Sequence, residues 1–236
     1  MKWPTVLSTS FLLVSCATGK NPQDPYEDFN RSVYKFNRSL DKAVLQPVAK
    51  GYKAVTPDPL EKGFDNFFSN IGDISNIINN VLQFKLADAS SDVGRLLVNS
   101  TLGLAGFFDP ASAMGLEKHD EDFGQTLAVW GVDSGAYLML PFLGPSTMRD
   151  TASIPADNYF DPLKELNPEG ARYTAKGFRL LIQRVSLLDL EEQLENALDE
   201  YSFVRDAYLQ NRKYKVYDGD LPLEDSFECD PEYEDC

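Results

Sequence analysis

Two long, almost uncharged stretches limit what this chain can fold into. One runs from Leu96 to Leu116 with Asp109 as its single charge, and the other from Thr126 to Met148 with only Asp133. Each is long enough to cross a bilayer, which takes about 20 residues, but both are interrupted by glycine and proline. The interruptions are Gly103, Gly106, Pro110, Gly115, Gly131, Gly135, Pro141, Gly144 and Pro145. Where a helix is interrupted, backbone N–H and C=O groups lose their partners and cannot face hydrocarbon. The stretches are therefore either buried core or segments that dip into one leaflet. The sequence favours neither alternative.

The N-terminal residues predict export and lipid attachment. An apolar or hydroxylic run over residues 6–14 is too short to span a membrane and suits the hydrophobic region of a signal peptide. The run ends in Leu13-Val14-Ser15-Cys16, which resembles a lipobox. This resemblance implies a signal peptide of residues 1–15 and acyl chains on Cys16, and two or more such chains anchor a protein stably. The alternative is an incidental cysteine in an ordinary signal peptide.

Residues 16–23 then form the lipidated start of the mature chain and a short polar tether. Ala17 follows the cysteine where an aspartate would also be possible. By resemblance to enterobacterial lipoproteins, that residue favours the outer membrane, with the anchor in its periplasmic (inner) leaflet.

The charge of the chain is concentrated at its C-terminal end. The formal net charge is -15 over 236 residues, and residues 218–236 carry nine acids and no lysine or arginine. Such a segment repels itself and has little to bury, so we expect an acidic disordered tail, with a docking peptide for a basic partner as the alternative. The acidity argues against nucleic acid as a partner. Cys229 and Cys236 lie in this tail, and either a disulfide or two free thiols is compatible with an exported chain.

The sequence offers little for catalysis or metal binding. It has one histidine and three cysteines, fewer than most nucleophilic triads and zinc sites need. His119 lies in a charged stretch of residues 117–122, which predicts a solvated loop histidine. We therefore expect no enzyme activity, no catalytic residues, no metal and no cofactor.

Residues 24–217 read as one all-α domain. Asp24 is placed to cap a helix that begins at Pro25, and Pro47, Pro57 and Pro59 predict breaks. Helical patterns follow over residues 60–86, 87–102 and 169–214, and no stretch alternates convincingly as a strand would. A Phe-Asn-Arg-Ser repeat at 29–32 and 36–39 places both copies on one helix face.

Two groups of side chains carry expectations about burial. An apolar stripe at helical spacing predicts a face packed on the core; it consists of Phe29, Val33, Phe36 and Leu40. Asparagines run beside the apolar residues of the next helix and suit a wet or head-group-facing surface; they are Asn66, Asn70, Asn76, Asn79 and Asn80.

Ordered motifs across residues 24–212 resemble the MlaA/VacJ family of outer-membrane lipoproteins. The most telling runs are Asp122-Phe123-Gly124-Gln125-Thr126-Leu127, Leu140-Pro141-Phe142-Leu143-Gly144-Pro145-Ser146 and Tyr201-Ser202-Phe203-Val204-Arg205-Asp206-Ala207-Tyr208. Two departures are local: Phe84 and Ala105 stand where family members often have glycine.

The resemblance implies a ring-like helical domain with interrupted amphipathic and apolar helices embedded in one membrane leaflet, beside a trimeric porin. Such proteins remove phospholipids from the outer leaflet through an amphipathic pore and pass them to a periplasmic MlaC-type lipid carrier, without a cofactor. The alternative is an adaptor lipoprotein that tethers porins or envelope proteins and moves no lipid. Under the first reading, the lipid-facing or pore candidates are Leu104, Phe107, Asp133, Gly135, Tyr137, Leu138 and Phe142.

Overall fold

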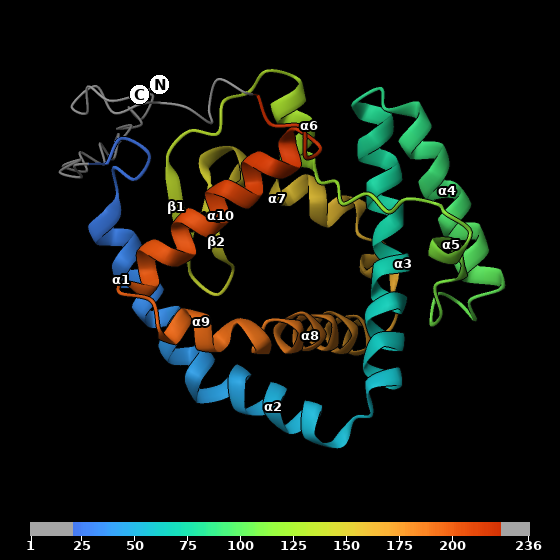
Figure 1. Cartoon of the computed structure of the whole chain (residues 1–236), viewed down its shortest axis with the longest axis horizontal. Helices are drawn as coiled ribbons and strands as arrows, with labels where there is room; N and C mark the ends of the chain where they lie inside the picture. The colour runs from blue at the N-terminus through green and yellow to red at the C-terminus, as the bar shows by residue number, and fades with distance from the viewer. Residues whose placement is uncertain (1–20, 223–236) are drawn as a thin grey trace, which may run out of the picture.

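The computed structural model describes residues 21–222. The signal peptide, Cys16, Cys229, Cys236 and most of the acidic tail lie outside the described residues, so the predictions for them stay predictions. Within the described part, the secondary-structure elements close into a ring (Figure 1). The circuit runs through α1, α2, α8, α3, α7 and a small β-hairpin, each packed on the next, and the hairpin packs back on α1. The predicted, mainly helical ring is therefore confirmed.

The first arc of the ring is one nearly continuous helical rod. It consists of α1 (Glu27–Leu40), a π-helical turn (Asp41–Leu45) and α2 (Gln46–Val55). Pro47 does not break this rod, contrary to expectation, because it follows directly on the π-helical turn, where the Gln46 N–H already bonds five residues back and the ordinary α-helical ladder is interrupted. The break falls at Thr56, whose backbone is extended, as the residue before a proline requires.

The far side of the ring is a pair of antiparallel helices. They are α3 (Asp58–Leu82) and α4 (Leu86–Thr101), close to the two helices predicted over 60–102. The tight connection between them puts Phe84 in the left-handed region at φ 63°. This explains why glycine is common there in the family that the sequence resembles. After α4 come α5 (Pro110–Ala113) and α6 (Phe123–Val129), which brings the chain back toward α3.

Part of the second uncharged stretch forms a β-hairpin. The prediction of a chain without strands is wrong here. Strand β1 (Tyr137–Leu140) pairs antiparallel with β2 (Gly144–Thr147), with Tyr137 opposite Thr147. Four residues are too few to show alternation clearly, and the turn relies on left-handed backbone at Phe142 (φ 65°) and Gly144 (φ 85°). The N-terminal segment joins this hairpin, because the Tyr137 N–H donates to the carbonyl of Gln23 at 2.9 Å.

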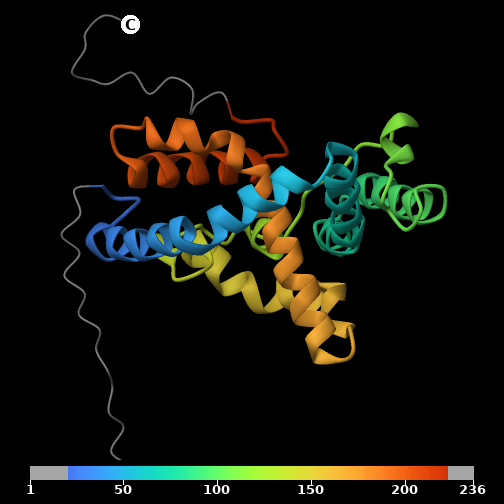
Figure 2. The ribbon, with the colours of Figure 1, turned by 90° about the horizontal axis from the view of Figure 1, so that it is seen from below.

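The C-terminal third forms three helices where the sequence predicts one long pattern. After α7 (Met148–Phe160) and a 3₁₀ turn (Pro162–Glu165) come α8 (Glu169–Ser186), a 3₁₀ turn (Leu188–Leu190), α9 (Glu191–Glu195) and α10 (Glu200–Val216). Asp199 caps the N-terminus of α10, because its carboxylate accepts a hydrogen bond from the Tyr201 N–H. Figure 2 shows α9 and α10 on one face of the ring, while the corner between α7 and α8 projects from the opposite face.

Candidate functional site

The polarity of this ring is inverted relative to that of an ordinary soluble domain. Two small apolar clusters are buried, one around Phe68 and Ile182 and one around Tyr137 and Tyr201. Most other buried side chains in residues 21–222 are polar or charged, while many large apolar ones are exposed. Soluble proteins bury polar groups sparingly and rarely expose large contiguous apolar patches. No helix among these residues is long and apolar enough to cross a membrane.

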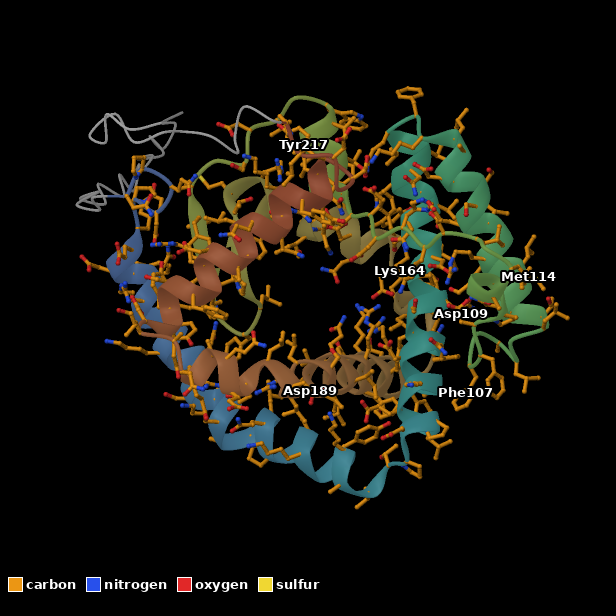
Figure 3. All side chains as sticks on the ribbon, in the orientation of Figure 1. Phe107, Asp109, Met114, Lys164, Asp189 and Tyr217 are labelled. Carbon is orange, nitrogen blue, oxygen red and sulfur yellow. The ribbon has the colours of Figure 1, made fainter. Side chains whose placement is uncertain are left out.

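A group of exposed apolar side chains lies on α4 and the loop that follows it, at the outer edge of the ring (Figure 1). On α4 and the following loop the exposed fractions are 60% for Leu97, 68% for Leu104 and 55% for Phe108. Met114, 59% exposed, lies beyond α4 on the side away from the centre (Figure 3). The predicted core stripe of the first helix is wrong for Phe29 and Phe36, which are 58% and 49% exposed, while Val33 packs against the cluster around Tyr137. The one buried residue of α1 is an asparagine.

Four of the five asparagines of α3 are buried, and Asn66 is half-buried, which corrects the expectation of a wet surface. Asn80 donates to the Asp92 carboxylate on α4 at 2.8 Å, and Asn76 donates to the His119 carbonyl at 2.6 Å. Asn79 accepts from the Thr126 hydroxyl on α6 at 2.9 Å. These amides pair α3 with its neighbours where a soluble protein would use leucine. His119 is not a free loop histidine either, because its Nδ1 lies 2.9 Å from the Asp92 carboxylate.

The same seam between α3 and α4 holds a carboxylate without a counter-ion in contact. Asp73 is fully buried, and one of its oxygens has no hydrogen-bond partner. Burial raises the pKa of Asp73 to about 6, although the charges of Arg95 and Lys118 act in the opposite direction. Near neutral pH this group is therefore a charge held in a poorly solvated place.

The first uncharged stretch is held to α4 by one arginine. The guanidinium of Arg95, 2% exposed, donates to the Asp109 carboxylate at 3.1 Å and to the Leu116 carbonyl at 2.7 Å. Burial raises the pKa of Asp109, but hydrogen bonds from Ser112, Asn99 and Arg95 outweigh it and bring the pKa to about 2. The loop that carries Leu104 is thus fixed by these charged contacts together with Phe107, whose ring lies 5.7 Å from that of Phe64 on α3.

The Phe-Asn-Arg-Ser repeat has a structural role that its spacing alone did not reveal. Asn30 donates to the Tyr137 carbonyl at 3.1 Å and accepts from the Met139 N–H at 2.8 Å. One repeat later, Asn37 donates to the Leu140 carbonyl at 2.9 Å and accepts from the Phe142 N–H at 2.9 Å. The two amides therefore act as a substitute strand along the open edge of β1.

The arginines of the repeat also make equivalent contacts. Arg31 reaches Asp199 at 2.6 Å, and Arg38 reaches Glu191 at 2.5 Å, so both tie α1 to the segment between α8 and α10. Asp24, which the sequence suggests as a helix cap, is fully buried and accepts from Asn30 at 2.8 Å and from the Tyr201 hydroxyl at 2.5 Å. The helix begins instead at Glu27 without a side-chain cap.

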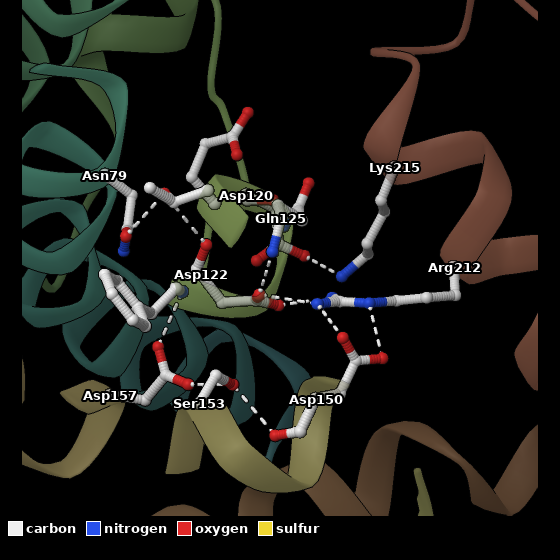
Figure 4. Close-up of polar contacts among 12 residues, drawn as sticks. Asn79, Asp120, Asp122, Gln125, Asp150, Ser153, Asp157, Arg212 and Lys215 are labelled. Carbon is white, nitrogen blue, oxygen red and sulfur yellow. Dashed lines mark hydrogen bonds and ion pairs between the residues drawn. The ribbon is translucent and has the colours of Figure 1, made fainter. Parts of the chain in front are cut away.

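A buried arginine joins α10 to α6 and α7 (Figure 4). Arg212 donates to Asp122 at 2.6 Å and to Asp150 at 2.9 Å, and the Tyr208 hydroxyl donates to Asp150 at 2.7 Å. Burial raises the pKa of both carboxyl groups, but their contacts with Arg212 outweigh it, so both pKa values lie below the usual range. Asp122 also caps α6 by accepting from the Gln125 N–H at 2.9 Å. These contacts fix the part of the wall that carries the hairpin.

Polar groups line a cavity of about 250 Å³ between α3 and α8. The loop after α5 contributes Lys118 and Asp120, and α8 contributes Arg179 and Gln183. Arg179 also pairs with Asp161 at 2.8 Å. The cavity therefore presents both signs of charge on a ring whose rim is apolar.

The predicted lipid-facing and pore residues fall into three groups. Leu104 and Phe142 are exposed, at 68% and 71%. Asp133 and Gly135 are exposed in the loop before the hairpin, while Phe107 and Leu138 are half-buried. Tyr137 faces neither lipid nor a pore in this structure, because its side chain is fully buried, with ring centroids 6.3 Å and 6.2 Å from those of Tyr201 and Tyr208.

The arrangement matches a known family. A model of the MlaA lipoprotein family matches residues 22–215. The chain belongs to this family. One relative is the intermembrane phospholipid transport system lipoprotein MlaA of Haemophilus influenzae, 32% identical over 227 residues that cover 92% of this chain and 91% of that protein. The protein of the same name from Escherichia coli is 33% identical over 220 residues, covering 89% and 86% of the two chains.

Two further matches extend the MlaA comparison. An uncharacterized protein of Rickettsia prowazekii is 36% identical over 201 residues, which cover 82% of this chain and 78% of that one. A solved structure described as "Structural basis for maintenance of bacterial outer membrane lipid asymmetry" superposes with a TM-score of 0.70 at 32% identity. It covers 82% of this chain and 98% of the solved one. The ring is therefore an MlaA fold.

Proposed function

We propose that this chain is an outer-membrane lipoprotein that removes mislocalised phospholipids from the outer leaflet and passes them to a periplasmic carrier, which maintains lipid asymmetry. The observation that carries the proposal is the inverted polarity of the ring, with an apolar rim and buried polar walls. The names of the MlaA relatives, which describe intermembrane phospholipid transport, support it.

The physics of a phospholipid explains why such a ring is useful. Moving a polar or charged head group through hydrocarbon costs several kcal/mol, whereas the acyl chains are favourably solvated there. A ring that exposes Leu97, Leu104 and Phe142 can stay in hydrocarbon. Its mixed-charge cavity, with Lys118 and Arg179, gives a head group partners inside. No bond is made or broken in such a transfer, so the proposed activity is transport and not catalysis.

The proposal includes a location and partners. The acylated Cys16 holds the ring in the periplasmic leaflet of the outer membrane, beside a trimeric porin, and the lipid leaves with a soluble carrier of the MlaC type. Leu104, Phe107, Leu138 and Phe142 then lie toward lipid, and Asp133 and Gly135 lie at the pore.

The test is complementation in a Gram-negative strain that lacks its own MlaA protein. Outer-leaflet phosphatidylethanolamine is measured with a membrane-impermeant amine-reactive label, at matched protein abundance. The expected result is that this chain returns the label to the level of the parent strain. The Cys16→Ala variant serves as the control, because without its anchor it should fail.

The adaptor reading predicts a different outcome. An adaptor would still co-purify with porin, but outer-leaflet phosphatidylethanolamine would remain as high as in the deletion strain. That result would overturn the transport proposal.

A further inference from the structure

The wall between α1, the hairpin, α8, α9 and α10 encloses an open cavity of about 500 Å³. Unlike the cavity between α3 and α8, its surface is mainly apolar. The apolar lining residues are chiefly Leu187, Leu190, Leu194, Phe203, Val204 and Ala207.

The lining comes from two segments. Leu187, Leu190 and Leu194 run from the end of α8 through the 3₁₀ turn into α9, and Val204 and Ala207 lie about one turn apart on α10. Leu187 and Leu190 are 51% and 49% exposed, so about half of each residue is left uncovered by the described residues. Apolar stripes at this spacing normally pack against something apolar.

Charged groups border the cavity, but each is already paired within the protein. Arg184 contacts Asp41 at 2.7 Å and Glu191 at 2.6 Å. Arg38 contacts Glu191 at 2.5 Å and Glu200 at 3.2 Å. Two cations and two carboxylates line the cavity, so its wall has no net charge and no unpaired ion to select a head group.

We propose that this cavity binds one acyl chain of a glycerophospholipid during its passage through the ring. This assignment rests on the proposed transport function and adds a tail site to it. The volume fits: a methylene takes up roughly the share of a water molecule, about 30 Å³, so the cavity holds on the order of 15 carbons. The saturated charges imply that the site recognises the chain and not the head group.

The experiment is photo-cross-linking with phospholipids that carry a diazirine near the middle of one acyl chain. The full-length lipidated protein is reconstituted in vesicles of such lipid, irradiated and digested, and labelled peptides are identified by mass spectrometry. The expected labels fall on residues 187–194 and 203–207 as well as on the rim around Leu97. Labels on the rim alone would overturn the proposal without any variant being needed.

Cavity-filling variants test the site directly. Ala207→Phe and Leu194→Trp should each lower labelling of the cavity peptides at least tenfold and slow complementation, while rim labelling is unchanged. The matched control is Leu198→Trp, because Leu198 lies on the same segment but is fully exposed and does not line the cavity. A filled variant that melts at the wild-type temperature and keeps its cavity label would overturn the assignment.

Two further results separate this inference from the transport proposal. Vesicles of phosphatidylethanolamine and of phosphatidylglycerol should label the cavity equally, within twofold, and a strong preference would contradict a site for the tail alone. If the wild-type chain moves lipid but filling the cavity changes nothing, the tail site is wrong and transport stands. If the wild-type chain moves no lipid, transport itself is wrong.

Discussion

Arg212 offers the sharpest test of how the ring wall is held together. In the Arg212→Met variant the length of the side chain is kept and its charge is lost, which leaves Asp122 and Asp150 facing each other. Asp150 carries most of the consequence, because its side chain is 9% exposed and that of Asp122 is 36% exposed. Breaking a buried ion pair from one side costs about 3–5 kcal/mol.

The expected loss lies near the lower end of that range. Asp150 keeps the Tyr208 hydroxyl at 2.7 Å and the Arg149 guanidinium at 3.1 Å. We therefore expect a loss of about 3 kcal/mol in the free energy of unfolding, which for a chain of this size lowers Tm by about 6–12 °C. Thermal unfolding followed by circular dichroism in detergent micelles measures it. Arg172→Met is the matched control, because its ion pair with Glu169 is exposed and worth at most about 1 kcal/mol.

The pH dependence gives the reasoning a second check. In the wild type the depressed pKa values of Asp122 and Asp150 stabilise the fold above about pH 4, and that contribution is lost on further acidification. In Arg212→Met, burial without the cation raises the pKa of Asp150, so the variant gains stability as its carboxyl takes up a proton. The difference in Tm between the wild type and Arg212→Met should therefore become smaller from pH 7 to pH 4. A gap that stays constant, or one no larger than for Arg172→Met, would refute the argument.

Four other predictions test the membrane placement, the anchor, the buried carboxylate and the strained loop. Single cysteines are introduced at the proposed positions in a background without the two tail cysteines. At the lipid-facing positions a lipid-phase quencher should reach the cysteine and an aqueous thiol reagent should not, and the reverse should hold at the pore positions. If no position is reached by the lipid-phase quencher, the ring does not lie in a leaflet. These positions are Leu104, Phe107, Leu138 and Phe142 for lipid and Asp133 and Gly135 for the pore. Cys16→Ala should lose the mass of its acyl chains and leave the outer-membrane fraction, and an unchanged mass would exclude Cys16 as the anchor. Asp73→Asn should raise Tm at pH 7 but not at pH 4. Burial raises the pKa of Asp73 to about 6, so the wild type itself gains stability as its carboxyl takes up a proton between pH 6 and pH 4. An equal rise in Tm at both pH values would contradict this. Ala105→Gly should raise Tm by about 2–4 °C, because left-handed backbone at φ 59° costs a non-glycine residue about 1 kcal/mol net. An unchanged Tm would mean that the loop carries no such strain.

The periodicity of the sequence located the long helices but not the direction in which their faces point. The patterns over 60–86 and 87–102 predicted α3 and α4 within a few residues. Helical spacing also placed Phe29 and Phe36 of the first helix in the core and Asn79 and Asn80 on a wet surface, and the structure reverses both. Spacing shows only that a helix has two unlike faces. Which face is buried depends on the solvent, and for a protein of the membrane that solvent is lipid.

The site was less predictable because its contacts join distant parts of the chain. The hairpin could not be read from its own four-residue strands, since the edge of β1 is completed by the side chains of Asn30 and Asn37. The seven-residue repeat was the available signal, but it does not identify its partner 107 residues away. Arg38, Arg184 and Arg212 were missed for the same reason: each is an ordinary helical arginine until its carboxylates are placed beside it.

The contacts that brace the ring differ widely in the length of chain that they span. Asp24 meets Tyr201 across 177 residues and Arg31 meets Asp199 across 168, whereas α3 and α4 are joined by only three residues. Contacts between neighbours in sequence form quickly, and contacts across long loops form slowly because the loop entropy is lost first. The α3–α4 pair can therefore form before the C-terminal helices have been made. The circuit closes through α8, which packs on both α2 and α3, so the chain stays an open arc until that helix is available, and α10 then braces the wall from one face.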